Sequence, residues 1–173
     1  QVMIKEMLGP EQVGYYAAAD KHSEAWYFIP LANTASLYPA IVNAKQASEK
    51  VYTDRMPKLY DLMVWMSLVI ADPPTCLSEW LITTVYGPTF IASATVLSLH
   101  IWAGVFVFLG VASSRWYLTE NLQKLFFYRS LTGVVINICL NLLLIPRLGI
   151  TGAAIATIIS QVFSSWLFDV FNS

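Results

Sequence analysis

Long apolar stretches separated by short polar segments make up most of the chain. Residues 80–114 contain no Asp, Glu, Lys or Arg, and neither do residues 148–168. A helix needs about 20 apolar residues to cross the hydrocarbon core of a membrane. Lipid cannot satisfy open backbone groups, and these runs are too long and too continuous for barrel strands. The pattern therefore predicts an all-α integral membrane protein.

Five spans are predicted from the apolar runs. Residues 1–10 end at Gly9-Pro10 and have the pattern of the end of a truncated preceding helix and a loop. Residues 11–173 then form a single membrane domain. Its spans lie at about 24–44, 60–86, 89–116, 125–146 and 150–171.

Prolines and polar residues mark the expected breaks. The first span belongs to one long helix over residues 11–45, kinked by its prolines. Residues 46–60 are polar and predict a loop or a surface helix. Asp72-Pro73-Pro74 is expected to interrupt the second span, and Pro146 to Gly149 to join the last two spans in a tight hairpin.

Composition agrees with this picture. The chain is 57% hydrophobic and 12% charged, whereas a soluble domain has about 25% charged residues. A net charge of -1 and the lack of a basic block give no sign of nucleic-acid binding. Cys76 and Cys139 both fall in apolar runs and are expected to be reduced packing residues.

The distribution of Lys and Arg predicts an orientation. Cations gather in residues 45–58 and again in residues 115–129, around the first and third loops, which share one side if there are five spans. Cytoplasmic loops are enriched in Lys and Arg. The C-terminus is therefore expected in the cytoplasm.

Asp72 is the acidic residue nearest the middle of a predicted span. An acid at that depth costs about 2.5–3.5 kcal/mol on insertion scales, which makes it a candidate for proton or cation coupling. The alternative is an acid that faces a wet cavity beside the two prolines and couples nothing.

Each of the remaining candidate residues has two interpretations, one as a substrate contact and one as a structural support. Lys21 and Glu24 share a helix face and could present a cation to an anionic ligand, or form an ion-paired helix entry. Arg129 could bind phosphate, or serve only as a cytoplasmic anchor. Asn137 and Asn141, four residues apart, bind substrate or join helices through their amides. His100 is expected to be a packed or cavity-facing residue.

Motifs for enzymatic chemistry are absent from the sequence. It has no G-x-S-x-G, no paired-histidine helix, no phosphate-binding loop and no acidic metal-binding loop. We therefore expect no catalytic residue, no metal site and no cofactor, and do not expect an enzyme.

Several stretches together resemble one transporter family. The sequence is similar to the oligosaccharide flippases of O-antigen and polysaccharide biosynthesis, in the multidrug/oligosaccharidyl-lipid/polysaccharide exporter superfamily. The stretches that carry the resemblance, in chain order, are MLGPEQVGYYAAADKHSEAWYFIP, SLYPAIVNAK, LYDLMVWMSLVIA, VYGPTF, LSLHIWAGVFVFLGVASSRWYLTENL and NICLNLLLIP through GAAIAT.

The resemblance implies most of the C-terminal six-helix bundle of a MATE-like flippase fold, without its first helix and the N-terminal lobe. Such a protein moves polyprenyl-diphosphate-linked oligosaccharide across the bacterial inner membrane. Lys21 matches a position where a basic residue is usual, and Glu24, Arg129 and Asn137 lie on similar motifs. Asp72 departs from the pattern, because an apolar residue is expected there.

The implied partners are lipid-linked oligosaccharide, membrane lipids and the missing N-terminal lobe. Two alternatives stay open. One is a cation-coupled exporter of small molecules from the same superfamily. The other is a membrane enzyme or a non-transporting scaffold in cell-envelope synthesis.

Overall fold

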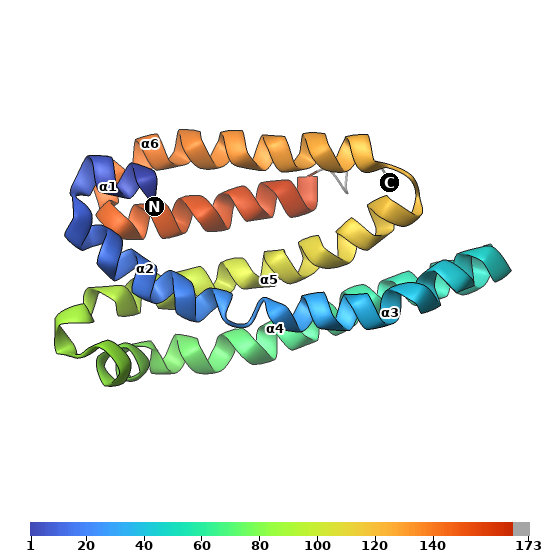
Figure 1. The fold of residues 1–173 in the computed structure, drawn as a ribbon, viewed down its shortest axis with the longest axis horizontal. Helices are drawn as coiled ribbons and strands as arrows, with labels where there is room; N and C mark the ends of the chain where they lie inside the picture. The colour runs from blue at the N-terminus through green and yellow to red at the C-terminus, as the bar shows by residue number, and fades with distance from the viewer. Residues whose placement is uncertain (168–173) are drawn as a thin grey trace.

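The computed structural model describes residues 1–167 as an elongated bundle of helices. Helices hold 93% of the residues, and the described part contains no strand. Figure 1 shows most of the helices running side by side along the long axis. They are α1 (Val2–Leu8), α2 (Pro10–Glu24), α3 (Phe28–Ala47), α4 (Glu49–Tyr86), α5 (Ala92–Thr119) and α6 (Gln123–Val162), followed by a π-helical turn at Phe163–Leu167.

The segment α6 is a hairpin of two antiparallel arms, as the sequence predicted (Figure 1). Gly149 reverses the chain with φ 61° and ψ −141°, a conformation that side chains with a Cβ rarely adopt. Gly152 lets the arms approach closely, because a Cβ there would collide with the carbonyl group of Leu144. Ala153, Ala154 and Ala156 are buried along the second arm, so the small residues serve packing.

Helix α5 lies at the centre, between the α6 hairpin and the α3–α4 pair (Figure 1). One apolar cluster joins α1, α2, α5, both arms of α6 and the end of α4, through residues such as Ile4, Ile82, Val96, Ile145 and Ala154. A second cluster joins α3, α4 and α5, with Ile41, Tyr52, Met63, Phe108 and Ala112 buried in it. The two clusters divide the bundle, and α5 contributes to both.

The loops after α3 and α5 meet at one end of the bundle. Lys45 Nζ lies 2.5 Å from Oε2 of Glu120, and it donates to the carbonyl oxygen of Thr119 at 3.4 Å. The first and third loops, which the sequence places on one side of a membrane, therefore lie at the same end of the bundle. Which side of a membrane this end faces stays a prediction.

The expected single helix over residues 11–45 is wrong. The chain breaks at residues 25–27, between α2 and α3. The amides of Tyr27 and Ile29 bond to the carbonyls of Glu24 and Trp26, three residues back instead of four. Pro30 has no N–H to continue the α-helical ladder, but it fits the first turn of α3. The proline thus starts a new helix instead of kinking an old one.

The expected interruption at Asp72-Pro73-Pro74 is also wrong, because α4 continues through it to Tyr86. The two prolines remove two ladder donors. The Thr75 hydroxyl donates to the carbonyl oxygen of Ala71 at 2.7 Å and so adds a local bond at this point. The polar residues 49–59 form the start of the same helix, which agrees with the surface-helix alternative.

Within residues 1–167, two helical segments are long and apolar enough to cross a membrane. They are Ala92–Thr119, with 28 residues and a mean hydropathy of 2.0, and Gln123–Ser165, with 43 residues and a mean hydropathy of 1.9. Length and composition thus suggest membrane association, whereas five crossings stay a prediction. Cys76 and Cys139 are free and exposed, so the expected packing role is not found within the described residues.

Candidate functional site

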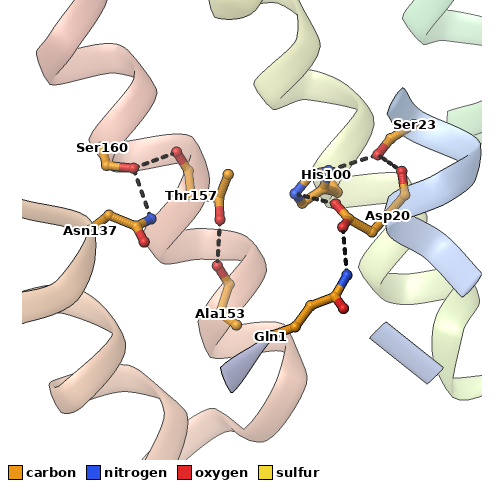
Figure 2. A network of polar contacts seen from close by, with 8 residues as sticks. All are labelled: Gln1, Asp20, Ser23, His100, Asn137, Ala153, Thr157 and Ser160. Carbon is orange, nitrogen blue, oxygen red and sulfur yellow. Dashed lines mark hydrogen bonds and ion pairs between the residues drawn. The ribbon is translucent and has the colours of Figure 1, made fainter. Parts of the chain in front are cut away.

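A cavity of about 520 Å³ opens between the α2–α5 pair and the α6 hairpin. Figure 2 shows side chains from these elements pointing toward one another across it. A neighbouring cavity of about 300 Å³ shares Val107, Ser130, Gln161 and Ser164 with it, so the two form one groove along the hairpin. Polar residues of the larger cavity are Gln1, Tyr16, Asp20, Glu24, Tyr27, His100, Ser130, Asn137, Thr157, Ser160, Gln161 and Ser164.

The wall formed by α2 and α5 is ionisable. Nε2 of His100 lies 3.5 Å from Oδ1 of Asp20, and Nδ1 of the same ring lies 2.8 Å from Oγ of Ser23. The amide of Gln1 donates to Oδ2 of Asp20 at 3.1 Å (Figure 2). The ring of Tyr16 meets the imidazole edge to face, with centroids 5.8 Å apart. Asp20 and Ser23 are three residues apart, so α2 presents both on the side that faces α5.

Ser23 links two helices and is not an exposed nucleophile. Its hydroxyl is completely buried and bonds to the carbonyl oxygen of Asp20 at 2.8 Å as well as to His100. A catalytic serine needs its oxygen open to substrate, with a base waiting to take its proton. The Asp–His–Ser set is therefore a buried polar contact that fixes α2 on α5.

The wall formed by the hairpin is polar but uncharged. Asn137 on the first arm donates to Oγ of Ser160 on the second arm at 3.0 Å, and Asn141 donates to Oδ1 of Asn137 at 2.8 Å. The hydroxyls of Ser160 and Thr157 donate to backbone carbonyls at 2.9 and 3.0 Å. The Asn137 amide joins the two arms and lines the larger cavity, whereas Asn141 bonds to it along the first arm.

Arg129 lies in the wall of the smaller cavity and is only 4% exposed. Its guanidinium lies over the ring of Tyr117, 5.4 Å from the centroid, and Nε donates to the carbonyl oxygen of Ser164. Gly110, which is part of α5, faces the same guanidinium. The cation is therefore held by the first arm, the second arm and α5 together.

The structure brings together some of the predicted site residues. Glu24 and Asn137 line the larger cavity, and Arg129 lines the smaller one beside it. Lys21 is exposed on α2 and is not part of either wall, and Asp72 is exposed on α4, away from both cavities. The substrate role of Lys21 and the coupling role of Asp72 stay predictions.

Sequence reasoning missed the central pair of the ionisable wall. The spacing of Asp20 to Ser23 and Glu24 places all three near one helix face, which is the local signal that the sequence carries for this wall. His100 is buried and lines the cavity, which confirms that expectation. Its partner Ser23 is 77 residues away in the sequence, so no local pattern could have joined them.

Chemically, the groove offers acceptors on one side, amides and hydroxyls on the other, and one buried cation at one end. No family model, no curated protein sequence and no solved structure matches this chain. Functional argument therefore depends on the groove and on the sequence.

Proposed function

We propose that the chain forms one lobe of a membrane flippase that moves polyprenyl-diphosphate-linked oligosaccharide across the bacterial inner membrane. The observation that carries this proposal is the polar groove inside an apolar helical bundle. The sequence resemblance to oligosaccharide flippases supplies the substrate class.

The lining of the larger cavity suits a sugar. Sugar hydroxyls donate to carboxylates such as Asp20 and Glu24, and they also exchange bonds with the amide of Asn137 and the hydroxyl of Ser160. An apolar ligand would leave these groups without partners, at a cost of about 1–3 kcal/mol for each buried polar group. The saccharide is therefore expected between α2 and the hairpin.

The diphosphate is expected beside Arg129, in the smaller cavity. A planar guanidinium can bind two phosphate oxygens at once. Asp20 and Glu24 would repel a diphosphate in the larger cavity, so the two parts of the substrate separate along the groove. This assignment keeps the diphosphate away from the two carboxylates, and it does not require Lys21 to move into the groove.

The apolar outer face of the hairpin supports a membrane setting. Leu131, Val135, Leu142 and Leu143 are exposed along the first arm and do not line the larger cavity. Contiguous apolar surface of this kind is typical of contact with lipid or with another protein. The proposed arrangement has five crossings, a cytoplasmic C-terminus and a second lobe that completes the cavity.

A binding experiment in lipid nanodiscs tests the proposal. The chain should bind undecaprenyl diphosphate carrying a saccharide more tightly than the same lipid without sugar. Asn137→Ala should weaken the binding of the sugar-bearing lipid only, whereas Arg129→Gln should weaken the binding of both lipids. Asn43→Ala, at an exposed position on α3, is the matched control and should change neither. Equal binding of both lipids, unaffected by Asn137→Ala, would overturn the assignment.

A second candidate is a cation-coupled exporter of small molecules. The specific observation in its favour is that the larger cavity has two carboxylates and no Lys or Arg among its lining residues. A cationic amphiphile is the matching probe. Binding of that probe, lost on Glu24→Gln, together with no binding of either diphosphate lipid, would favour export over flipping.

A further inference from the structure

The contacts of Ser23 bear on which ring nitrogen of His100 carries a proton. The Ser23 oxygen lies 2.8 Å from the carbonyl oxygen of Asp20 and 2.8 Å from Nδ1 of His100. A carbonyl oxygen can only accept, and a serine hydroxyl has a single proton to donate. If Ser23 donates to that carbonyl, the second contact requires Nδ1 of His100 to donate to Ser23. Both contacts are then satisfied hydrogen bonds.

The opposite ring nitrogen then faces a carboxylate. In a neutral imidazole with a proton on Nδ1, Nε2 is an acceptor. It lies 3.5 Å from Oδ1 of Asp20, which is also an acceptor when ionised. Two facing acceptors in a site where His100 is 4% exposed would repel each other. One proton between them removes the repulsion, whether it is held mainly by the imidazole or mainly by the carboxyl group.

We propose that Asp20 and His100 form a proton-binding site that joins α2 to α5 in the wall of the cavity. The site holds one proton more than a neutral histidine and an ionised aspartate would hold separately. This proposal is independent of the transport function, because it follows from the hydrogen-bond pattern alone.

The negative charges near the pair favour retention of this proton. From α1, the Gln1 amide occupies Oδ2 of Asp20 and leaves Oδ1 for the proton. From α2, Glu24 adds a second carboxylate to the same cavity, while Lys21 is exposed outside it. From α6, Asn137, Thr157 and Ser160 contribute no charge.

The other titratable groups nearby are aromatic or have other partners. Tyr16 contacts the His100 ring, and Tyr27 lines the same cavity. His22 on α2 bonds to the carbonyl of Ala18 at 3.2 Å, and Tyr86 of α4 lies 3.5 Å from its Nδ1. Within the described residues, no Lys or Arg lines this cavity, so no fixed cation there replaces the proton.

Loss of the proton has a structural consequence. The imidazole must then move its remaining proton to Nε2 to satisfy Asp20, and Nδ1 can no longer donate to Ser23. The Ser23 hydroxyl can then turn to donate to Nδ1, and it gives up its bond to the carbonyl oxygen of Asp20, close to the helix break at residues 25–27. Occupancy of the site is therefore coupled to the backbone hydrogen bonding of α2 beside that break.

Nitrogen NMR of the imidazole tests the site directly. The sequence has two histidines, so His22→Gln leaves His100 as the single imidazole signal. The 15N-histidine-labelled chain is placed in lipid nanodiscs and followed against pH. Near neutral pH, Nδ1 should be protonated, and Nε2 should carry or share a second proton. The neutral ring with a proton only on Nε2 would overturn the proposal.

Two variants separate the contributions of the partners. Asp20→Asn should leave a neutral ring protonated on Nδ1 near neutral pH, because the proton-sharing carboxylate is gone. Ser23→Ala should release Nδ1 and shift the ring toward the Nε2-protonated neutral form. Ser36→Ala removes a similar hydroxyl-to-backbone bond on the exposed face of α3 and should leave the spectrum unchanged.

The helix content of each variant is measured to show that it folds. If Asp20→Asn does not fold, the Ser23→Ala variant still tests the proposal. A His100 spectrum that is the same in Ser23→Ala and in the parent chain would overturn the tautomer assignment. A spectrum of Asp20→Asn that still shows a second proton on the ring near neutral pH would overturn the role of Asp20.

Discussion

The two walls of the cavity each join two helical segments through buried polar groups, but the chemistry of these groups differs. The α2–α5 wall joins two helices through an acid, an imidazole and a buried hydroxyl, which makes the contact sensitive to proton occupancy. The hairpin wall joins its two arms through neutral amides and hydroxyls, with small residues bringing the backbones together. Neutral groups need no compensating charge when buried, whereas ionisable groups do.

This difference teaches where movement is expected. The hairpin is held by close packing, by the neutral bond from Asn137 and by the permanently charged Arg129, so it forms the fixed wall. The α2 segment is joined to α5 by a titratable pair and is followed by a helix break, so it forms the adjustable wall. The predictions below test this division by substitutions in the hairpin, at its boundary with α5, and at the surface.

The largest effect is expected at the closest approach of the hairpin. Gly152→Leu places a side chain against the carbonyl group of Leu144, and overpacking of this kind costs about 3 kcal/mol. Thermal unfolding in detergent micelles measures the loss. Gly14→Ala is the matched control, because a Cβ there meets nothing within 4 Å. It should be neutral or stabilising by up to about 1 kcal/mol. An unchanged melting temperature for Gly152→Leu would contradict the fixed-wall description.

The next effect is expected at the boundary between hairpin and α5. Arg129→Gln removes a charge-assisted bond to the Ser164 carbonyl and the cation–π contact with Tyr117. We expect a loss of about 2 kcal/mol in the free energy of unfolding. Denaturant unfolding monitored by circular dichroism measures it. Lys124→Gln, at an exposed position at the start of α6, should change stability by less than about 0.5 kcal/mol.

A smaller loss of stability is expected when the hydrogen bonds among Asn137, Asn141 and Ser160 are broken. Asn137→Ala breaks the bonds to Ser160 and Asn141, and bonds of this kind between membrane helices average about 0.6 kcal/mol each. The expected loss is therefore about 1 kcal/mol, and it should not depend on pH. A loss that varies with pH would show that the hairpin wall is not the neutral one.

The smallest effect is expected at the surface ion pair between Lys45 and Glu120. The hydrogen bond from Lys45 lowers the pKa of the Glu120 carboxyl below its ordinary value. A lowered folded-state pKa stabilises the fold above the unfolded pKa, and that stability is lost as pH falls through the folded pKa. Both side chains are partly exposed, so the contribution is about 0.5 kcal/mol.

Unfolding of the parent chain and of Lys45→Gln, compared at acidic and neutral pH, measures this contribution. The parent chain should gain slightly more stability than the variant on going from acid to neutral pH. Equal gains would mean that the pair makes no pH-dependent contribution.

Sequence determined the elements better than it determined their ends. Apolar runs without charge predicted α5 and both arms of α6, because a helix in lipid or in a helical core leaves a long and continuous signal. Gly9-Pro10 and Gly149 marked real turns, and both glycines have positive φ. Prolines misled at two places, because their effect depends on neighbours. Pro30 begins a helix, whereas Pro73 and Pro74 lie inside one.

Tertiary structure alone decided which polar residues meet. The sequence placed Glu24, Arg129 and Asn137 on helices, and folding brought them to one groove. It left Lys21 and Asp72 outside that groove. Local patterns report spacing along a helix, but they say nothing about the rotation of one helix against another. The pairing of Asp20 and Ser23 with His100 depends on that rotation. Composition and periodicity therefore determined a helical, apolar chain, and packing of α2 on α5 created its ionisable site.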